Sequence, residues 1–219
     1  MKIKDFDAVL LDLDGTLIDS APDISMALNH ALAQCGFATF DIELTRSWIG
    51  NGVDKLLERA LVAANSNDLN VSTQQVKRAF FESYAKLNGQ YSRVYPGVRD
   101  ALTYCQQHGI KLACVTNKPS AFSAPLLADK QLLEFFPVLI SGDDVEHKKP
   151  NPEMLYDAAR QLAVNPGACL VVGDSENDVL AAQSANMKIC AVSYGYDQGV
   201  DLTTLGIDAK IDSITNLID

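Results

Sequence analysis

The chain has 219 residues, of which 47% are hydrophobic and 21% charged, a composition typical of a soluble globular protein with a substantial core. Its formal net charge of −10 argues against nucleic-acid or membrane binding, because both partners require surfaces rich in Lys and Arg. The sequence shows no secretory signal, no membrane-spanning apolar run and no Cys-x-x-Cys pair among its five cysteines. We therefore expect a cytoplasmic protein with free thiols.

The first apolar run, Phe6–Leu11, is typical of a buried strand and leads directly into Asp12-Leu13-Asp14-Gly15-Thr16-Leu17. Two carboxylates two residues apart at a strand end repel each other unless something compensates their charge. A divalent cation is the simplest compensation. One of the carboxylates is then available as a nucleophile.

Helical patterns without a strand follow up to about residue 87, with a polar loop at 65–70. We predict a helical cap domain over residues 17–88, inserted after the first strand of an α/β core domain formed by 1–16 and 89–219. An insertion at this point lies above the ligand-binding edge of the sheet and can act as a lid. Within it, Gly50-Asn51-Gly52 is either a substrate loop or a helix start. Arg46 either reaches the substrate or is an ordinary surface residue.

After the insertion, apolar runs alternate with helical patterns, one of which opens at Asn151-Pro152 and ends at Leu162. This alternation predicts a doubly wound, Rossmann-like parallel sheet. The expected strands are Ile110–Val115, Val138–Ile140, Cys169–Val172 and Ile189–Val192.

Polar residues follow several of these strands, and the carboxyl ends of parallel strands meet at one edge of a sheet. Oxygen ligands there select a hard cation such as Mg²⁺, while a hydroxyl and a lysine hold phosphate oxygens and a carboxylate attacks phosphorus. Of two adjacent lysines, Lys149 is expected to point inward, because Pro150 favours an extended backbone before it. The residues expected to converge are Asp12, Asp14, Thr116, Asn117, Lys149, Asp174 and Asp178.

With these motifs the chain resembles the haloacid dehalogenase-like hydrolase superfamily over nearly its whole length. Ser175-x-x-Asp178 also fits a helix capping box, so a structural role for Asp178 stays open. The resemblance implies that Asp12 is the nucleophile that forms an aspartyl-phosphate, and that Asp14 is the general acid/base, whose backbone carbonyl also binds Mg²⁺. It implies that the Thr116 hydroxyl binds phosphate and that Lys149 pairs with the nucleophile and the phosphoryl group. It also implies that Asp174 is a metal ligand and that Asp178 supports it.

Because it has Asp14 as a second aspartate in the first motif, the chain resembles the phosphoryl-transfer members of the superfamily rather than the dehalogenases. Further segments resemble the phosphoglycolate phosphatase subfamily: Trp48-Ile49-Gly50-Asn51-Gly52, Val115-Thr116-Asn117-Lys118-Pro119 and Tyr194-Gly195-Tyr196. The resemblance implies a Mg²⁺-dependent phosphomonoesterase for a small-molecule phosphomonoester, with 2-phosphoglycolate as the leading substrate, in a monomer or homodimer. The alternatives are a sugar-phosphate mutase on the same core and a non-catalytic phospholigand-binding protein.

Overall fold

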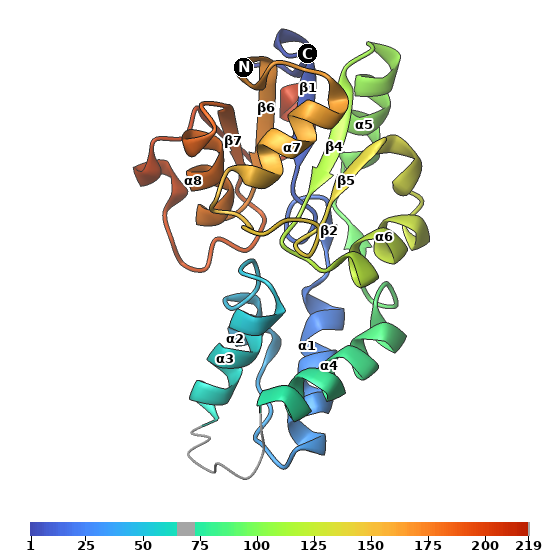
Figure 1. Ribbon diagram of the computed structural model, residues 1–219, viewed down its shortest axis with the longest axis vertical. Helices are drawn as coiled ribbons and strands as arrows, with labels where there is room; N and C mark the ends of the chain where they lie inside the picture. Colours follow the sequence, from blue (N-terminus) through green and yellow to red (C-terminus); the bar gives the residue numbers. More distant parts are fainter. Residues whose placement is uncertain (65–72, 219) are drawn as a thin grey trace.

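The computed structural model describes residues 1–64 and 73–218. Within them a six-stranded sheet with helices on both faces lies above a group of cap helices, and both chain ends lie at the far end of the core from the cap (Figure 1). The polar loop expected at 65–70 falls outside the described residues. No described helix combines the length and apolar character that crossing a bilayer would need.

The strands of the large sheet are all parallel, in the order β5-β4-β1-β6-β7-β8. β1 lies between β4 and β6, and its last residue, Leu11, is level with Cys114 and Val172 on the two neighbours. The loops that leave these three strands therefore begin side by side. The strands are β1 (Ala8–Leu11), β4 (Lys111–Val115), β5 (Val138–Ile140), β6 (Cys169–Gly173), β7 (Lys188–Val192) and β8 (Ala209–Ile211).

Alternate residues of β1 enter two different hydrophobic clusters, as expected of a strand covered on both faces. Val9 and Leu11 pack with α5 (Val98–Gln107) and α6 (Ser120–Asp129), whereas Ala8 and Leu10 pack with α7 (Glu153–Leu162) and α8 (Glu176–Ser184). This is the doubly wound α/β arrangement predicted from the sequence. Short 3-10 helices occupy Ile3–Asp5, Leu133–Phe135, Pro166–Ala168, Leu202–Leu205 and Ile214–Leu217.

The cap helices form most of a third hydrophobic cluster, which contains Leu28, Leu57 and Phe80 and extends to Phe122 and Tyr196 of the core. Two short antiparallel strands join the cap to the core where the chain leaves the core and where it returns. The joining strands are β2 (Ile18–Asp19) and β3 (Arg93–Val94), and the cap helices are α1 (Ala21–Gln34), α2 (Ile42–Arg46), α3 (Val53–Ala63) and α4 (Thr73–Leu87). The division at residues 17–88 stays a prediction.

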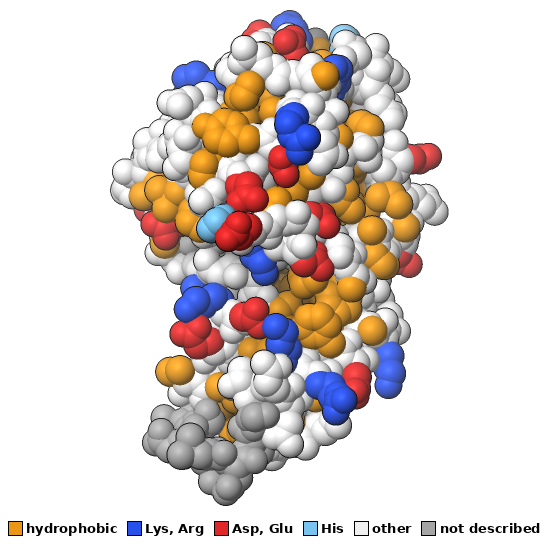
Figure 2. Space-filling model, in the orientation of Figure 1, with side chains coloured by type: hydrophobic (Ala, Val, Ile, Leu, Met, Phe, Trp, Pro, Cys, Tyr) orange, Lys and Arg blue, Asp and Glu red, His pale blue; other side chains and the backbone are white. Residues whose placement is uncertain are grey.

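The cap also contacts the core through aromatic rings. Phe81 and Tyr84 of α4 pack against Phe122 of α6, with ring centroids 5.2 and 4.7 Å apart. Hydrophobic side chains gather at the surface where the cap meets the core (Figure 2). The position of α4 over the sheet edge is therefore set by apolar packing.

The observed elements differ from the predicted ones mainly at their ends. The first strand begins at Ala8 rather than Phe6, and the helix expected from Asn151 begins at Glu153. Asn151 still accepts a hydrogen bond from the Glu153 amide at 2.9 Å, as a capping side chain does. β8 was not expected from the sequence, because Ala209–Ile211 is a short, half-buried strand at the sheet edge.

Candidate active site

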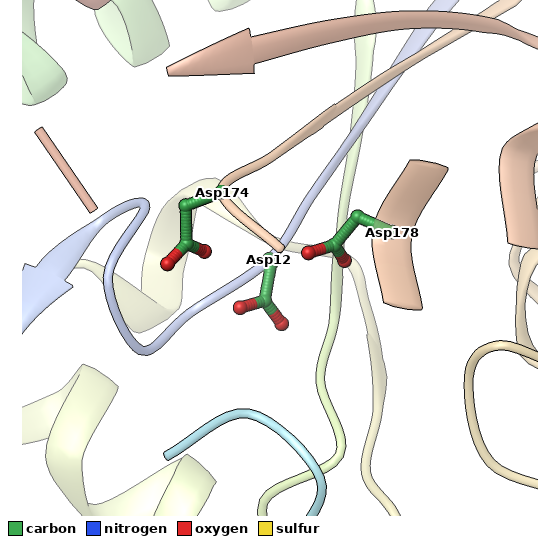
Figure 3. Close-up of side chains that lie close together, drawn as sticks. All are labelled: Asp12, Asp174 and Asp178. Carbon is green, nitrogen blue, oxygen red and sulfur yellow. The ribbon is translucent and has the colours of Figure 1, made fainter. Parts of the chain in front are cut away.

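Three carboxylates meet at the ends of β1 and β6. Asp12 directly follows β1, Asp174 follows β6, and Asp178 lies in the first turn of α8; one oxygen of each lies within 4.8 Å of the others. Figure 3 shows Asp12 between the other two. The convergence expected from the sequence is therefore present at this sheet edge.

Lys149 neutralises part of this negative charge. Its ammonium group donates to Asp12 Oδ1 at 2.8 Å, to Asp178 Oδ1 at 2.6 Å and to the Val115 carbonyl at 2.7 Å. The residue is 5% exposed, so these contacts lie in a low-dielectric environment where charge pairs interact strongly. Burial alone would lower the pKa of Lys149, but Asp12 and Asp178 raise it more, and the lysine stays charged.

One lysine does not balance three carboxylates. Burial raises the pKa of Asp12 to about 7, and although Lys149 opposes this shift, Asp178 and Asp14 add to it. Burial likewise raises the pKa of Asp174 well above its usual range, with Asp12 and Asp178 contributing. A bound cation would favour the ionised form of both groups, so this cluster has the charge of a possible metal site.

The surroundings of Asp174 hold its carboxyl group in a fixed position. The Thr16 hydroxyl donates to Oδ1 at 2.8 Å and the Tyr196 amide donates to Oδ2 at 2.6 Å. A Cβ on Gly15 or Gly195 would overlap this carboxyl group, so both backbones approach it as only glycine allows. Oxygen-only donors in a preorganised cluster fit Mg²⁺ better than softer metals.

Asp178 makes the helix-capping contacts that its sequence pattern predicts, whereas its support of a metal ligand stays a prediction. Its Oδ2 accepts from the Ser175 amide at 3.1 Å and the Ser175 hydroxyl at 2.6 Å, which completes a capping box at the start of α8. Its Oδ1 accepts from Lys149. The side chain therefore both caps a helix and positions the lysine that contacts Asp12.

Asp14 makes contacts of its own. The Lys118 ammonium donates to its two oxygens at 3.0 and 3.1 Å, and the Ser20 hydroxyl donates to Oδ1 at 2.5 Å. Lys118 also donates to the Tyr84 hydroxyl of α4 at 2.5 Å. Asp14 lines the same cavity as Asp12, a placement that is compatible with a general acid/base.

A cavity of about 50 Å³ lies between the cap and these residues. Asp12, Asp14, Thr116 and Asn117 line it from the core, and Gly50 and Gly52 line it from the cap. The Gly50 carbonyl accepts from the Asn117 and Asn177 side chains at 3.0 and 3.3 Å. The Gly50-Asn51-Gly52 segment, which immediately precedes α3, is therefore held against the core by the same loops that carry the catalytic motifs.

Arg46 and Asn51, two further candidates for substrate binding, do not line this cavity. The Arg46 guanidinium is 3.5 Å from Asp19 and 3.3 Å from Glu43, and it is absent from the described residues that line the cavity. Asn51 accepts from the Gln198 side chain at 3.2 Å and is likewise absent from the cavity lining. Their assignment to substrate binding stays a prediction.

Three contacts were missed by sequence reasoning. Lys118 lies in the segment Val115-Thr116-Asn117-Lys118-Pro119. From the sequence we expect Thr116 and Asn117 of this segment at the site, but not Lys118. Tyr84 is one of the buried residues of α4. Ser20 directly precedes α1 and makes no side-chain cap hydrogen bond. No local sequence signal identifies these contacts, because they depend on how the cap packs on the core.

Comparison with known proteins agrees with this geometry. The family described as "Haloacid dehalogenase-like hydrolase" matches residues 9–192. The chain is 36% identical over 216 residues to a phosphoglycolate phosphatase of Nitrosococcus oceani, covering 98% of this chain and 96% of that protein. A phosphoglycolate phosphatase encoded on a plasmid of Cupriavidus necator is 41% identical over 210 residues, which cover 96% of this chain and 90% of that protein.

A solved structure shows that this fold, core and cap together, also occurs in a similar protein. The crystal structure of a "predicted phosphoglycolate phosphatase" from Haemophilus somnus superposes with a TM-score of 0.91 at 31% identity, covering 95% of each chain. The match extends over the cap as well as the core, because it leaves only a small part of either chain uncovered.

Proposed function

Since the chain belongs to the haloacid dehalogenase-like hydrolase family, we propose that it is a Mg²⁺-dependent phosphomonoesterase that acts through an aspartyl-phosphate on Asp12. The observation that carries this proposal is the placement of Asp12. Its carboxylate lies between Asp174 and Asp178, contacts Lys149 and lines a cavity closed by the cap.

In the first step Asp12 attacks phosphorus, and Asp14 protonates the leaving alkoxide. Thr116 and Lys149 provide a hydroxyl and a positive charge for the phosphoryl oxygens. In the second step Asp14 removes a proton from the water that hydrolyses the aspartyl-phosphate. Asp12, Asp174 and the Asp14 carbonyl, with Asp178 in support, would hold Mg²⁺, which when bound neutralises charge on the transferring group.

The leading substrate is 2-phosphoglycolate. The relatives named above carry the name phosphoglycolate phosphatase. The five cysteines are free, which fits the reducing cytoplasm in which such metabolites occur.

Phosphate release from a panel of monoesters, without an added phosphate acceptor, tests the proposal. We expect release from 2-phosphoglycolate that requires Mg²⁺ and is lost in Asp12→Asn, while the variant keeps its fold. Interconversion of sugar phosphates without net release would indicate a mutase. Tight binding without any turnover would indicate a phospholigand-binding protein.

A further inference from the structure

The two walls of the cavity differ in chemistry. The core wall is polar, whereas the cap side chains that face it are mostly apolar: Ile24, Ile49, Val53, Leu56 and Phe80. A sugar hydroxyl buried against these side chains would lose its hydrogen bonds to water without replacement. The cap wall therefore favours substrates that carry few uncharged polar groups.

Among the described residues that line the cavity, Lys118 is the one cationic side chain. It is 6% exposed, and its ammonium lies 4.7 Å from the centroid of the Tyr84 ring. Lys149 differs because its three N–H groups are matched by Asp12, Asp178 and the Val115 carbonyl. Lys118 contacts two side chains, Asp14 and Tyr84, and unlike Lys149 it lines the cavity itself.

Tyr84 adds a hydrogen-bond donor at the same point. Its hydroxyl accepts from Lys118 at 2.5 Å, which leaves its own O–H available, and the described part of the chain offers that O–H no acceptor. The residue is 2% exposed and lines the cavity. A buried hydroxyl next to an ammonium is a paired donor set suited to a carboxylate.

We infer that Lys118 and Tyr84 bind the second negative charge of the substrate and so restrict it to short phosphomonoesters that carry a carboxylate near the ester. This inference rests on the proposed function and names the residues that select the substrate. The core motifs contact only phosphate and metal, which all monoesters share. Discrimination must come from other groups that line the cavity, and Lys118 and Tyr84 are two of them.

The test compares two ligands of equal length, 2-phosphoglycolate and ethyl phosphate, in which a methyl group replaces the carboxylate. Binding is measured by calorimetry with Mg²⁺ present in Asp12→Asn protein, which does not turn the ligands over. In this background Lys118→Met should weaken 2-phosphoglycolate binding by about 30-fold or more and Tyr84→Phe by about 3- to 10-fold, since hydrogen bonds to charged groups are strong. Ethyl phosphate binding should change by less than about 3-fold in both.

Two substitutions of the same chemical kind serve as controls. Lys86→Met removes an exposed lysine from the same helix as Tyr84, and Tyr156→Phe alters an exposed tyrosine on α7. Both should leave the preference for 2-phosphoglycolate unchanged. In the active protein, Tyr84→Phe should raise KM for 2-phosphoglycolate with a smaller effect on kcat.

The inference is overturned if both ligands weaken equally in Tyr84→Phe and Lys118→Met, or if the parent protein binds both with the same affinity. These results do not depend on turnover. Failure of the proposed function would instead appear as absence of phosphate release from every monoester by the unsubstituted protein.

Discussion

The backbone amide of Tyr196 donates a 2.6 Å hydrogen bond to Asp174. The hydroxyl of the same tyrosine accepts from the Ser20 and Ala21 amides at 2.9 and 3.0 Å and donates to Asp19 at 2.5 Å. One residue therefore links a candidate metal ligand to the start of the first cap helix. This explains why a Tyr-Gly-Tyr segment accompanies the catalytic motifs.

Tyr196→Phe should lower the free energy of unfolding by about 1–3 kcal/mol, because it leaves the two buried amides of Ser20 and Ala21 without their acceptor. The backbone contact to Asp174 is retained, so the Mg²⁺ affinity of the folded variant should stay near that of the parent. Urea unfolding and metal titration measure the two effects. An unchanged unfolding free energy would show that the hydroxyl does not fix the cap.

The stability of the metal-free protein should depend on pH through Asp12. Since burial raises its pKa from 3.8 to about 7, the folded protein holds a proton that the unfolded chain has released between these values. The free energy of unfolding therefore falls as pH rises through this window. Asp12→Asn cannot titrate at this position and should show a smaller fall, measured by thermal unfolding at a series of pH values.

Bound Mg²⁺ should reverse this loss, because it stabilises the ionised carboxylates. The increase in Tm on adding Mg²⁺ should be larger at about pH 7.5 than at about pH 5, where Asp12 is protonated before the ion binds. A Tm increase that is the same at the two pH values, or larger at the lower one, would contradict a metal held by Asp12.

Asp14→Asn should separate substrates by their leaving groups. Glycolate is a poor leaving group that needs a proton, whereas the phenolate of an aryl phosphate departs without one. We expect kcat/KM for 2-phosphoglycolate to fall much more than kcat/KM for the aryl ester. Equal losses would mean that Asp14 does not act as the acid or that hydrolysis of the aspartyl-phosphate limits both reactions.

Gly52→Val tests the cap segment next to the cavity. Gly52 has φ +83, and a Cβ there would lie 3.5 Å from the Asn117 carbonyl and from Lys148 Nζ. A β-branched residue is strained in this conformation. We expect kcat/KM to fall strongly for 2-phosphoglycolate and less for an aryl phosphate. Equal losses would place the segment in folding or cap closure rather than in specificity.

The core of the site could be predicted because it follows from strand ends. The pairing of β1 with β6 aligns Leu11 with Val172, so Asp12 and Asp174 follow within two residues of this pair at one sheet edge. Apolar runs identify both strands in the sequence. Lys149 was distinguished from Lys148 by the proline that follows it, and the structure buries Lys149 against Asp12.

The contacts between cap and core could not be predicted in the same way. Tyr84 meets Lys118 only because α4 packs on α6 through Phe122, a tertiary contact that no local pattern encodes. Likewise nothing in the sequence marks Asp19 as the partner of Arg46. Helix stripes indicate which residues are buried, but not which distant loop they face.

Trapping of the phosphorylated enzyme tests the central claim most directly. The protein is mixed with 2-phosphoglycolate and Mg²⁺, quenched during turnover, reduced with borohydride and analysed by peptide mass spectrometry. Reduction converts an acyl phosphate of aspartate to homoserine. The account predicts homoserine at position 12 and unmodified Asp14, with no modification when substrate is omitted. Continued phosphate release with an unmodified Asp12, or modification at another carboxylate, would contradict the proposed nucleophile.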